Sequence, residues 1–153
     1  MPTGSCLCGK VKYHVTELSS TKMAHCHCSD CRKFHGAAFS TFGETKTLQW
    51  TAGQSTELST FVAPNGSRRQ FCSNCGSSLT FRSKDAPPGT IEFALSTLDH
   101  DEAGRETSDH QADPQIKGNE FILRPDAHVF VSSKVPWINI DGDGLDQHSR
   151  DRS

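Results

Sequence analysis

The 153-residue sequence lacks a large excess of charge of either sign, and this argues against several functions. Its 16 Lys and Arg residues nearly balance 18 Asp and Glu residues, giving a formal net charge of −2. A chain with this balance and no lysine-rich run offers no extended basic surface, so the sequence predicts no nucleic-acid partner. No apolar run approaches the roughly 20 residues that a membrane-spanning helix needs, so no membrane partner is expected.

The sequence also lacks a secretory leader and a rich supply of apolar residues. Its first residues, MPTGSCLCGK, contain neither the basic start nor the apolar stretch of a signal peptide, which predicts a cytoplasmic protein. Only 33% of the residues are hydrophobic, so a second source of stability is expected, and the seven cysteines are the candidates. Disulfides are rare in the cytoplasm and an odd number of cysteines cannot pair completely, which favours metal binding.

The sequence has no sustained 3.6-residue apolar period, and short strand-like runs dominate it instead. Residues 10–15, KVKYHV, alternate apolar and polar side chains in the manner of a half-buried strand. Asn65-Gly66 lies between two such runs and predicts a hairpin turn. One helical turn is expected at residues 30–36, ending at a glycine. The predicted fold is therefore mostly β.

The polar segments suggest how the chain is organised. A single domain is expected over residues 1–140, because the chain is too short for two cores of ordinary size. Residues 99–126 are polar and longer than most connections, which predicts an insertion within this domain. Residues 141–153, DGDGLDQHSRDRS, contain little that can be buried, so we expect a flexible tail.

The cysteines fall into two pairs and a triplet. Two thiolates separated by one or two residues can reach the same tetrahedral zinc ion, and two pairs together make a closed four-thiolate site. A site with three protein ligands keeps a position for water or substrate, so a remaining triplet is typical of an open, catalytic zinc site. The pairs are Cys6 with Cys8 and Cys72 with Cys75, and the triplet is Cys26, Cys28 and Cys31.

The spacing leaves alternatives open. It does not fix which pairs share an ion, and a neighbouring histidine (His25, His27 or His35) could complete the triplet as a fourth ligand. Without its zinc, the triplet could also act as a thiol redox sensor.

Four ordered motifs use every cysteine and resemble a known family. GSCLCG, CHCSDCRK, FCSNCGSSL and HVFVSSKVPW, spread over residues 4–140, are similar in order and spacing to the glutathione-dependent formaldehyde-activating (GFA) family, which shares its domain with centromere protein V. The resemblance implies a β-tent zinc-binding fold of small bent antiparallel sheets. It also implies a structural zinc at Cys6, Cys8, Cys72 and Cys75 and a catalytic zinc at Cys26, Cys28 and Cys31. Two zinc sites per chain are thus expected, the second only partly occupied if its thiolates oxidise.

The resemblance implies a zinc-dependent carbon–sulfur lyase. Its reaction joins a thiol, glutathione, to a small aldehyde, formaldehyde, to give S-(hydroxymethyl)glutathione. A zinc-bound thiol is deprotonated by the metal, which makes this chemistry plausible at neutral pH. The alternative is a non-catalytic binding module in which both zinc ions are structural, as implied by the centromere-associated relatives.

Basic and aromatic residues supply further hypotheses. Arg32 and Lys33 follow the triplet and could moderate its thiolate charge. The carboxylates of glutathione call for basic partners, and Arg68 and Arg69 alternate along a predicted strand, so at most one of them can face a given pocket. Lys134 is a further candidate, whereas Trp137 and the phenylalanines at positions 34, 39 and 42 are expected to pack in the core.

Overall fold

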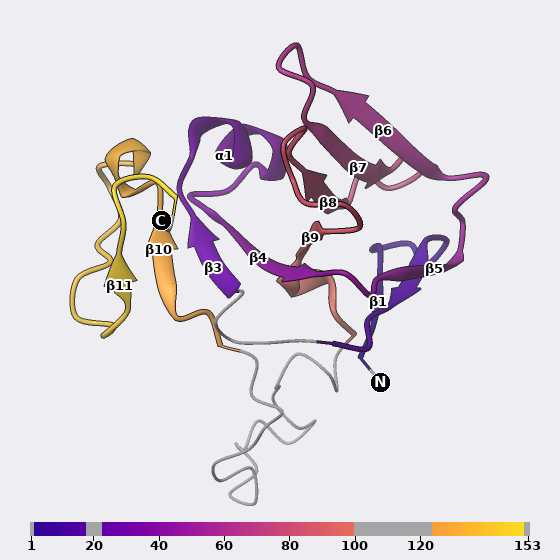
Figure 1. Cartoon of the computed structure of the whole chain (residues 1–153), viewed down its shortest axis with the longest axis horizontal. Coiled ribbons are helices and arrows are strands. Elements are labelled where there is room, and N and C mark those ends of the chain that lie inside the picture. Colours follow the sequence, from indigo (N-terminus) through magenta and orange to yellow (C-terminus); the bar gives the residue numbers. More distant parts are fainter. Residues whose placement is uncertain (1, 18–22, 100–123, 152–153) are drawn as a thin grey trace, which may run out of the picture.

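The computed structural model describes residues 2–17, 23–99 and 124–151 and confirms a mostly-β, single-domain fold (Figure 1). The described strands form two sheets, one of three strands and one of eight. The smaller sheet has the order β1-β2-β5, with β1 at Thr3–Ser5, β2 at Lys12–His14 and β5 at Gln49–Ala52.

The larger sheet has the strand order β11-β10-β3-β4-β9-β8-β7-β6 and runs across the molecule (Figure 1). Its strands are β3 (Met23–Cys26), β4 (Ser40–Thr45), β6 (Leu58–Val62), β7 (Arg68–Cys72), β8 (Ser78–Arg82), β9 (Ile91–Ala94), β10 (Ala127–Val129) and β11 (Asp146–Gln147). Among the described residues the helices are α1 (Ser29–His35) and the short 3₁₀ turns η2 (Leu95–Thr97) and η3 (Val131–Ser133). None of these helices is long and apolar enough to cross a membrane.

Local sequence signals produce several of these elements as predicted. The hairpin between β6 and β7 turns at Asn65 and Gly66, where Gly66 has a φ of 87° and the Asn65 carboxamide oxygen accepts a hydrogen bond from the Ser67 amide at 2.9 Å. Helix α1 ends at Gly36, which has the left-handed conformation (φ 60°) that glycine adopts most easily.

The C-terminal part of the described chain differs from the prediction. β10 pairs in parallel with β3, and β11 pairs in parallel with β10, so the larger sheet is mixed and not wholly antiparallel. The backbone amide of His148 donates to the carbonyl of His128 at 2.9 Å, and that of Phe130 donates to the carbonyl of Arg150 at 3.0 Å. These bonds involve part of residues 141–153, for which the sequence predicts a flexible tail. Backbone pairing, which composition does not reveal, holds this polar segment.

Most of the predicted insertion at 99–126 lies outside the described residues, because the description stops at Asp99 and resumes at Arg124. Asp99 itself is fixed by the small sheet. Its carboxylate accepts hydrogen bonds from the hydroxyls of Thr3 and Ser5, both at 2.7 Å.

The core consists of three apolar clusters, and two of them contain cysteines. The first contains Tyr13, Val15, Met23 and Phe93, all essentially inaccessible to solvent. The second joins Cys6 and Cys72 to Val11 and Leu79, and the third joins Cys26 and Cys31 to Phe42 and Val129. Four of the seven cysteines are therefore part of the apolar core.

Candidate functional site

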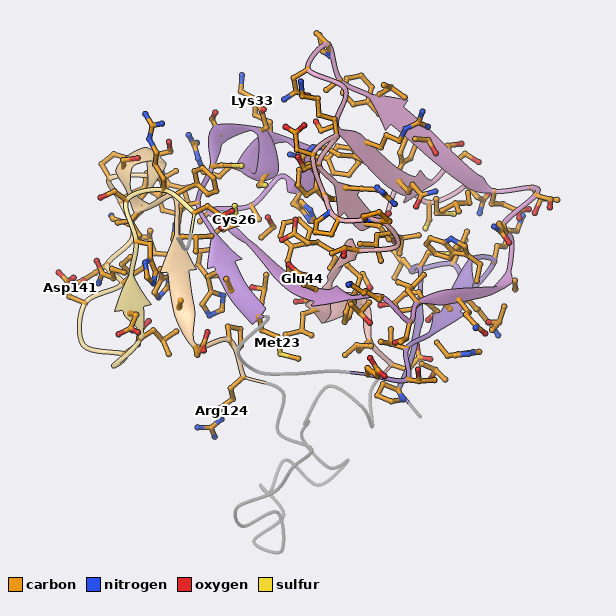
Figure 2. All side chains as sticks on the ribbon, in the orientation of Figure 1. Met23, Cys26, Lys33, Glu44, Arg124 and Asp141 are labelled. Atoms are coloured by element: carbon orange, nitrogen blue, oxygen red, sulfur yellow. The ribbon has the colours of Figure 1, made fainter. Side chains whose placement is uncertain are left out.

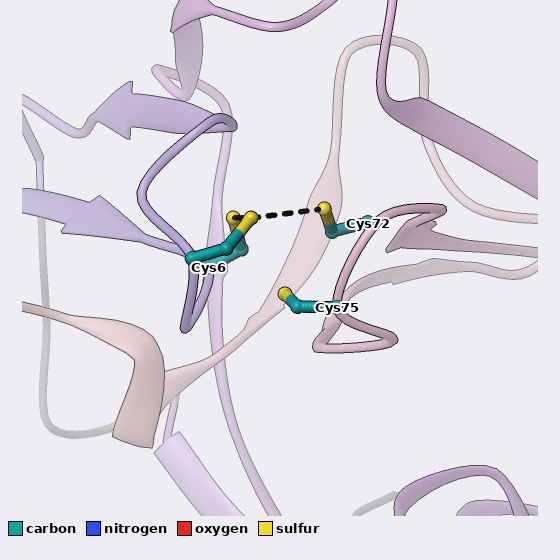
Figure 3. Close-up of side chains that lie close together, drawn as sticks. Cys6, Cys72 and Cys75 are labelled. Carbon is teal, nitrogen blue, oxygen red and sulfur yellow. Dashed lines mark hydrogen bonds between the residues drawn. The ribbon is translucent and has the colours of Figure 1, made fainter.

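The two cysteine pairs come together between the two sheets. Cys6 and Cys8 lie in the loop from β1 to β2, while Cys72 ends β7 and Cys75 lies in the turn before β8. Figure 3 shows Cys6, Cys72 and Cys75 pointing toward a common centre, and the four sulfurs all lie within 4.8 Å of one another. The structure thus brings together the four residues that the family resemblance assigns to one ion.

The sulfur spacing suits a tetrahedral metal. The Cys6 and Cys8 sulfurs are 3.5 Å apart, and the Cys8 and Cys72 sulfurs are 3.8 Å apart. Tetrahedral zinc–thiolate bonds of about 2.3 Å place neighbouring sulfurs about 3.8 Å apart. All seven cysteines are free thiols. A metal bound here would join the small sheet to the large one.

Donors from the backbone and from a side chain support the four-cysteine group. The Val11 amide donates to the Cys6 sulfur at 3.3 Å. The Ser77 hydroxyl lies 3.3 Å from the Cys75 sulfur and is the main cause of a Cys75 pKa lowered to about 5. A thiol with a lowered pKa is more readily the thiolate that a metal binds.

The cysteine triplet is assembled by the end of a strand and the start of a helix. Cys26 is the last residue of β3, Cys28 is the N-cap of α1, and Cys31 lies in the first turn of that helix. The Cys31 amide donates to the Cys28 sulfur at 3.2 Å, and the Cys26 and Cys31 sulfurs are 3.5 Å apart. The three sulfurs also lie within 4.8 Å of one another and fit a single ion.

No histidine of the described chain joins the triplet. Side chains alternate along β3, so His25 and His27 point away from Cys26 toward the opposite face of the sheet. There His27 Nε2 lies 2.9 Å from His128 Nδ1, and His128 Nε2 lies 2.7 Å from the carboxylate of Asp143. Burial lowers the pKa of His27 to about 4, so this imidazole is neutral at pH 7. Among the described residues, the group that could hold an ion here consists of the three cysteines alone.

Arg69 is the cation that the triplet contacts. Its side chain is only 6% exposed, and both terminal guanidinium nitrogens lie 3.7 Å from the Cys31 sulfur. The guanidinium stacks on the Phe81 ring at 4.5 Å and lies 5.5 Å from the centre of the Phe34 ring. Arg68 points to solvent, which confirms that only one of the two adjacent arginines faces a pocket.

The other predicted basic and aromatic candidates have different places. Lys33 lies exposed on the outer side of α1 (Figure 2), and Arg32 is half-buried. Lys134 donates to the backbone carbonyls of Val135 and Ile138, at 2.9 and 2.6 Å. Trp137 is 74% exposed, so its expected place in the core is wrong.

The triplet opens into a cavity of about 560 Å³. Its apolar wall includes Phe42, Phe81, Val129 and Phe130, and its polar wall includes Arg69, Glu44, Glu92 and Asp151. A cavity of this size lies within the range of about 300–1,000 Å³ that is usual for small-molecule sites. None of the four-cysteine residues lines this cavity, whereas Cys75 lines a second cavity of about 520 Å³, so the two cysteine groups face different spaces.

No sequence motif points to Glu92, a lone acid in the short strand β9. Burial, followed by the nearby charges of Asp151 and Glu44, raises its pKa to about 7, while Arg69 acts in the opposite direction. Only the pairing of β9 with β4 and β8 brings Glu92 to the cavity.

The chain is similar to proteins of a known family. The family model described as "Glutathione-dependent formaldehyde-activating enzyme" matches residues 1–133, which is most of the chain. The chain belongs to this GFA family.

Individual relatives of this GFA chain are distant. A Halomonas elongata protein named "Putative glutathione-dependent formaldehyde-activating enzyme" is 27% identical over 148 residues, covering 90% of this chain and 80% of the relative. An uncharacterized lyase of Schizosaccharomyces pombe is 27% identical over 78 residues, covering 51% of this chain and 55% of the relative. A crystal structure of a Rhodobacter sphaeroides protein superimposes with a TM-score of 0.52 at 22% identity, covering 76% of this chain and 95% of that one, which supports the fold alone.

Proposed function

We propose that this GFA protein is a zinc-dependent carbon–sulfur lyase that adds a thiol such as glutathione to a small aldehyde such as formaldehyde. The observation that carries the proposal is the three-cysteine group facing a cavity, with no fourth ligand among the described residues. Family membership and the names of the relatives support the same reaction class. We place the reaction in the cytoplasm, where thiols stay reduced.

The two cysteine groups take different roles in this proposal. Cys6, Cys8, Cys72 and Cys75 would hold a structural zinc ion, closed by four thiolates. Cys26, Cys28 and Cys31 would hold the second, open ion. When bound at the triplet, zinc supplies an acidic centre that converts an incoming thiol to its thiolate at neutral pH.

The residues around the triplet prepare the cavity for this chemistry. Three thiolates leave a divalent site with an excess negative charge, and the Arg69 guanidinium at Cys31 offsets it. Arg69 is also the basic side chain of the cavity wall, so it is the candidate partner for a substrate carboxylate. Phe42, Phe81 and Val129 exclude water from the space beside the sulfurs.

The zinc content of protein purified under reducing conditions tests the proposal, together with a Cys26→Ser variant. We expect two zinc ions per chain in the natural protein and one in the variant, with the fold retained. Isothermal titration with glutathione should show binding that the variant loses, and NMR should show faster formation of S-(hydroxymethyl)glutathione than in buffer alone. One zinc ion in both proteins, with no thiol binding, would contradict the proposal and favour a non-catalytic module.

A further inference from the structure

A single cross-strand row of side chains forms one wall of the cavity. Arg69 on β7 is paired with Phe81 on β8, Phe81 is paired with Glu92 on β9, and Glu92 is paired with Glu44 on β4. Directly paired residues point to the same face of a sheet, with Cβ atoms about 4.5–5.5 Å apart. All four residues line the cavity that holds the cysteine triplet. Figure 2 labels Glu44, which lies on β4.

In this row Phe81 lies between the basic side chain of Arg69 and the acidic side chain of Glu92. The Arg69 guanidinium turns toward Cys31 and stacks on Phe81. No ion pair joins the Glu92 carboxyl to a basic side chain anywhere in the described chain. The titratable groups that face Glu92 are Glu44 on β4, Asp151 in the C-terminal segment, Arg69 on β7 and Cys28 at the start of α1.

This environment gives Glu92 an accessible proton near neutral pH. Burial, followed by the charges of Asp151 and Glu44, raises its pKa to about 7. A carboxyl group with a pKa near the working pH both holds and releases a proton, which is the requirement for general acid–base catalysis. Most structural carboxylates at a sheet surface are ionised at pH 7.

We propose that Glu92 is the proton carrier of the reaction, giving a proton to the aldehyde oxygen during addition and removing it during the reverse reaction. The inference rests on the proposed function, because it assumes that a thiol and an aldehyde meet in the cavity beside Cys26, Cys28 and Cys31. Nothing in the sequence motifs assigns a role to this residue.

The step balances without another reactant. A sulfur lone pair forms the new C–S bond to the carbonyl carbon as the carbonyl π bond breaks. The electron pair left on oxygen takes the proton of the Glu92 carboxyl group, which gives the hydroxyl of the product. The proton lost by the thiol then replaces it on the Glu92 carboxylate. The net change is one thiol and one aldehyde converted to one hemithioacetal.

A titration that does not depend on activity tests the acid directly. In zinc-loaded protein labelled with ¹³C at the glutamate carboxyl carbons, the resonance absent from a Glu92→Gln variant belongs to Glu92. We expect its midpoint near pH 7. A midpoint near the ordinary glutamate value of about 4.3 would overturn the proposal, since the residue would hold no proton to give.

The pH dependence of the rate tests the role. We expect addition to slow above about pH 7 and the reverse reaction to slow below it, because each direction needs one protonation state of Glu92. Glu92→Gln should reduce the addition rate at pH 6 by about 100-fold. It should also remove the part of the pH–rate profile in which the addition rate falls as Glu92 loses its proton. Glu92→Asp should retain a fall in the addition rate with rising pH.

Glu44→Gln is the matched control, since it removes the same charge from the paired position. Removing this negative neighbour should lower the pKa of Glu92. The fall in the addition rate should then occur at lower pH and should not disappear. A Glu92→Gln variant that keeps the natural rate and its fall with rising pH would overturn the inference and leave the lyase proposal standing. Failure of the natural protein to accelerate any thiol–aldehyde pair would overturn both.

Discussion

The two cysteine groups use the same ligand atom and differ in what surrounds it. The four-cysteine group combines the β1–β2 loop of the small sheet with the end of β7 and the following turn of the large sheet, and its sulfurs face one another. The three-cysteine group lies at a strand end and a helix start, beside a buried arginine and a cavity with acidic residues in its wall. The comparison teaches that cysteine spacing indicates a metal, whereas access and nearby charge decide what the metal can do.

The largest expected effect comes from breaking the four-cysteine group. Cys72 is fully buried and packs with Val11 and Leu79, so Cys72→Ser removes a ligand and also places a hydroxyl in the core. We expect the free energy of unfolding to fall by more than about 4 kcal/mol, which thermal or urea unfolding will measure.

Cys28→Ser is the counterpart of this change in the triplet. Cys28 is only half-buried and lies in the cavity wall, so its replacement should release one zinc ion and leave most of the stability intact. Equal losses of stability in Cys72→Ser and Cys28→Ser would remove the distinction between a structural group and an open one.

A smaller change in stability is expected from Glu92→Gln, and it should depend on pH. The folded-state pKa of about 7 lies above the ordinary glutamate value, so ionising Glu92 destabilises the fold as pH rises from about 4.3 through about 7. The variant should therefore be more stable than the natural protein at pH 8, by up to about 3 kcal/mol, and differ little at pH 4. Urea unfolding at both pH values will measure this, and an equal difference at both would contradict it.

The smallest expected effect comes from Arg69→Lys. A lysine keeps the charge but loses the planar group that places two nitrogens at the Cys31 sulfur and stacks on Phe81. We expect the zinc affinity of the triplet to fall by about tenfold while the four-cysteine group keeps its affinity. Competition with a chromophoric chelator will measure both, with Arg68→Lys on the exposed side of β7 as the control.

Much of the fold was predictable because its signals are local. The alternation in residues 10–15, the turn at Asn65-Gly66 and the glycine that ends α1 each depend on a few neighbouring residues. The grouping of the cysteines was also predictable, since four plus three ligands use all seven. Only the family resemblance, however, assigned the two pairs to one ion.

The remaining features depend on contacts between distant segments. β11 is held by backbone pairing with β10, which its polar composition conceals. Alternation showed that Arg68 and Arg69 face opposite sides but not which one is buried. Glu92 acquires its environment from the preceding strand β8 but also from β4 and the C-terminal segment, which lie far from it in sequence.

The alternation of histidine and cysteine along residues 25–28 has a consequence for insertions and deletions. Moving β3 by one residue against β4 and β10 would exchange the two faces, and His25 and His27 would take the places of Cys26 and Cys28, while Cys31 stays on α1. The shifted chain would still offer metal ligands, but nitrogen in place of sulfur, with a different preference among metals. A single-residue change in length here would therefore change the coordination chemistry, and it would also break the contact of His27 with His128.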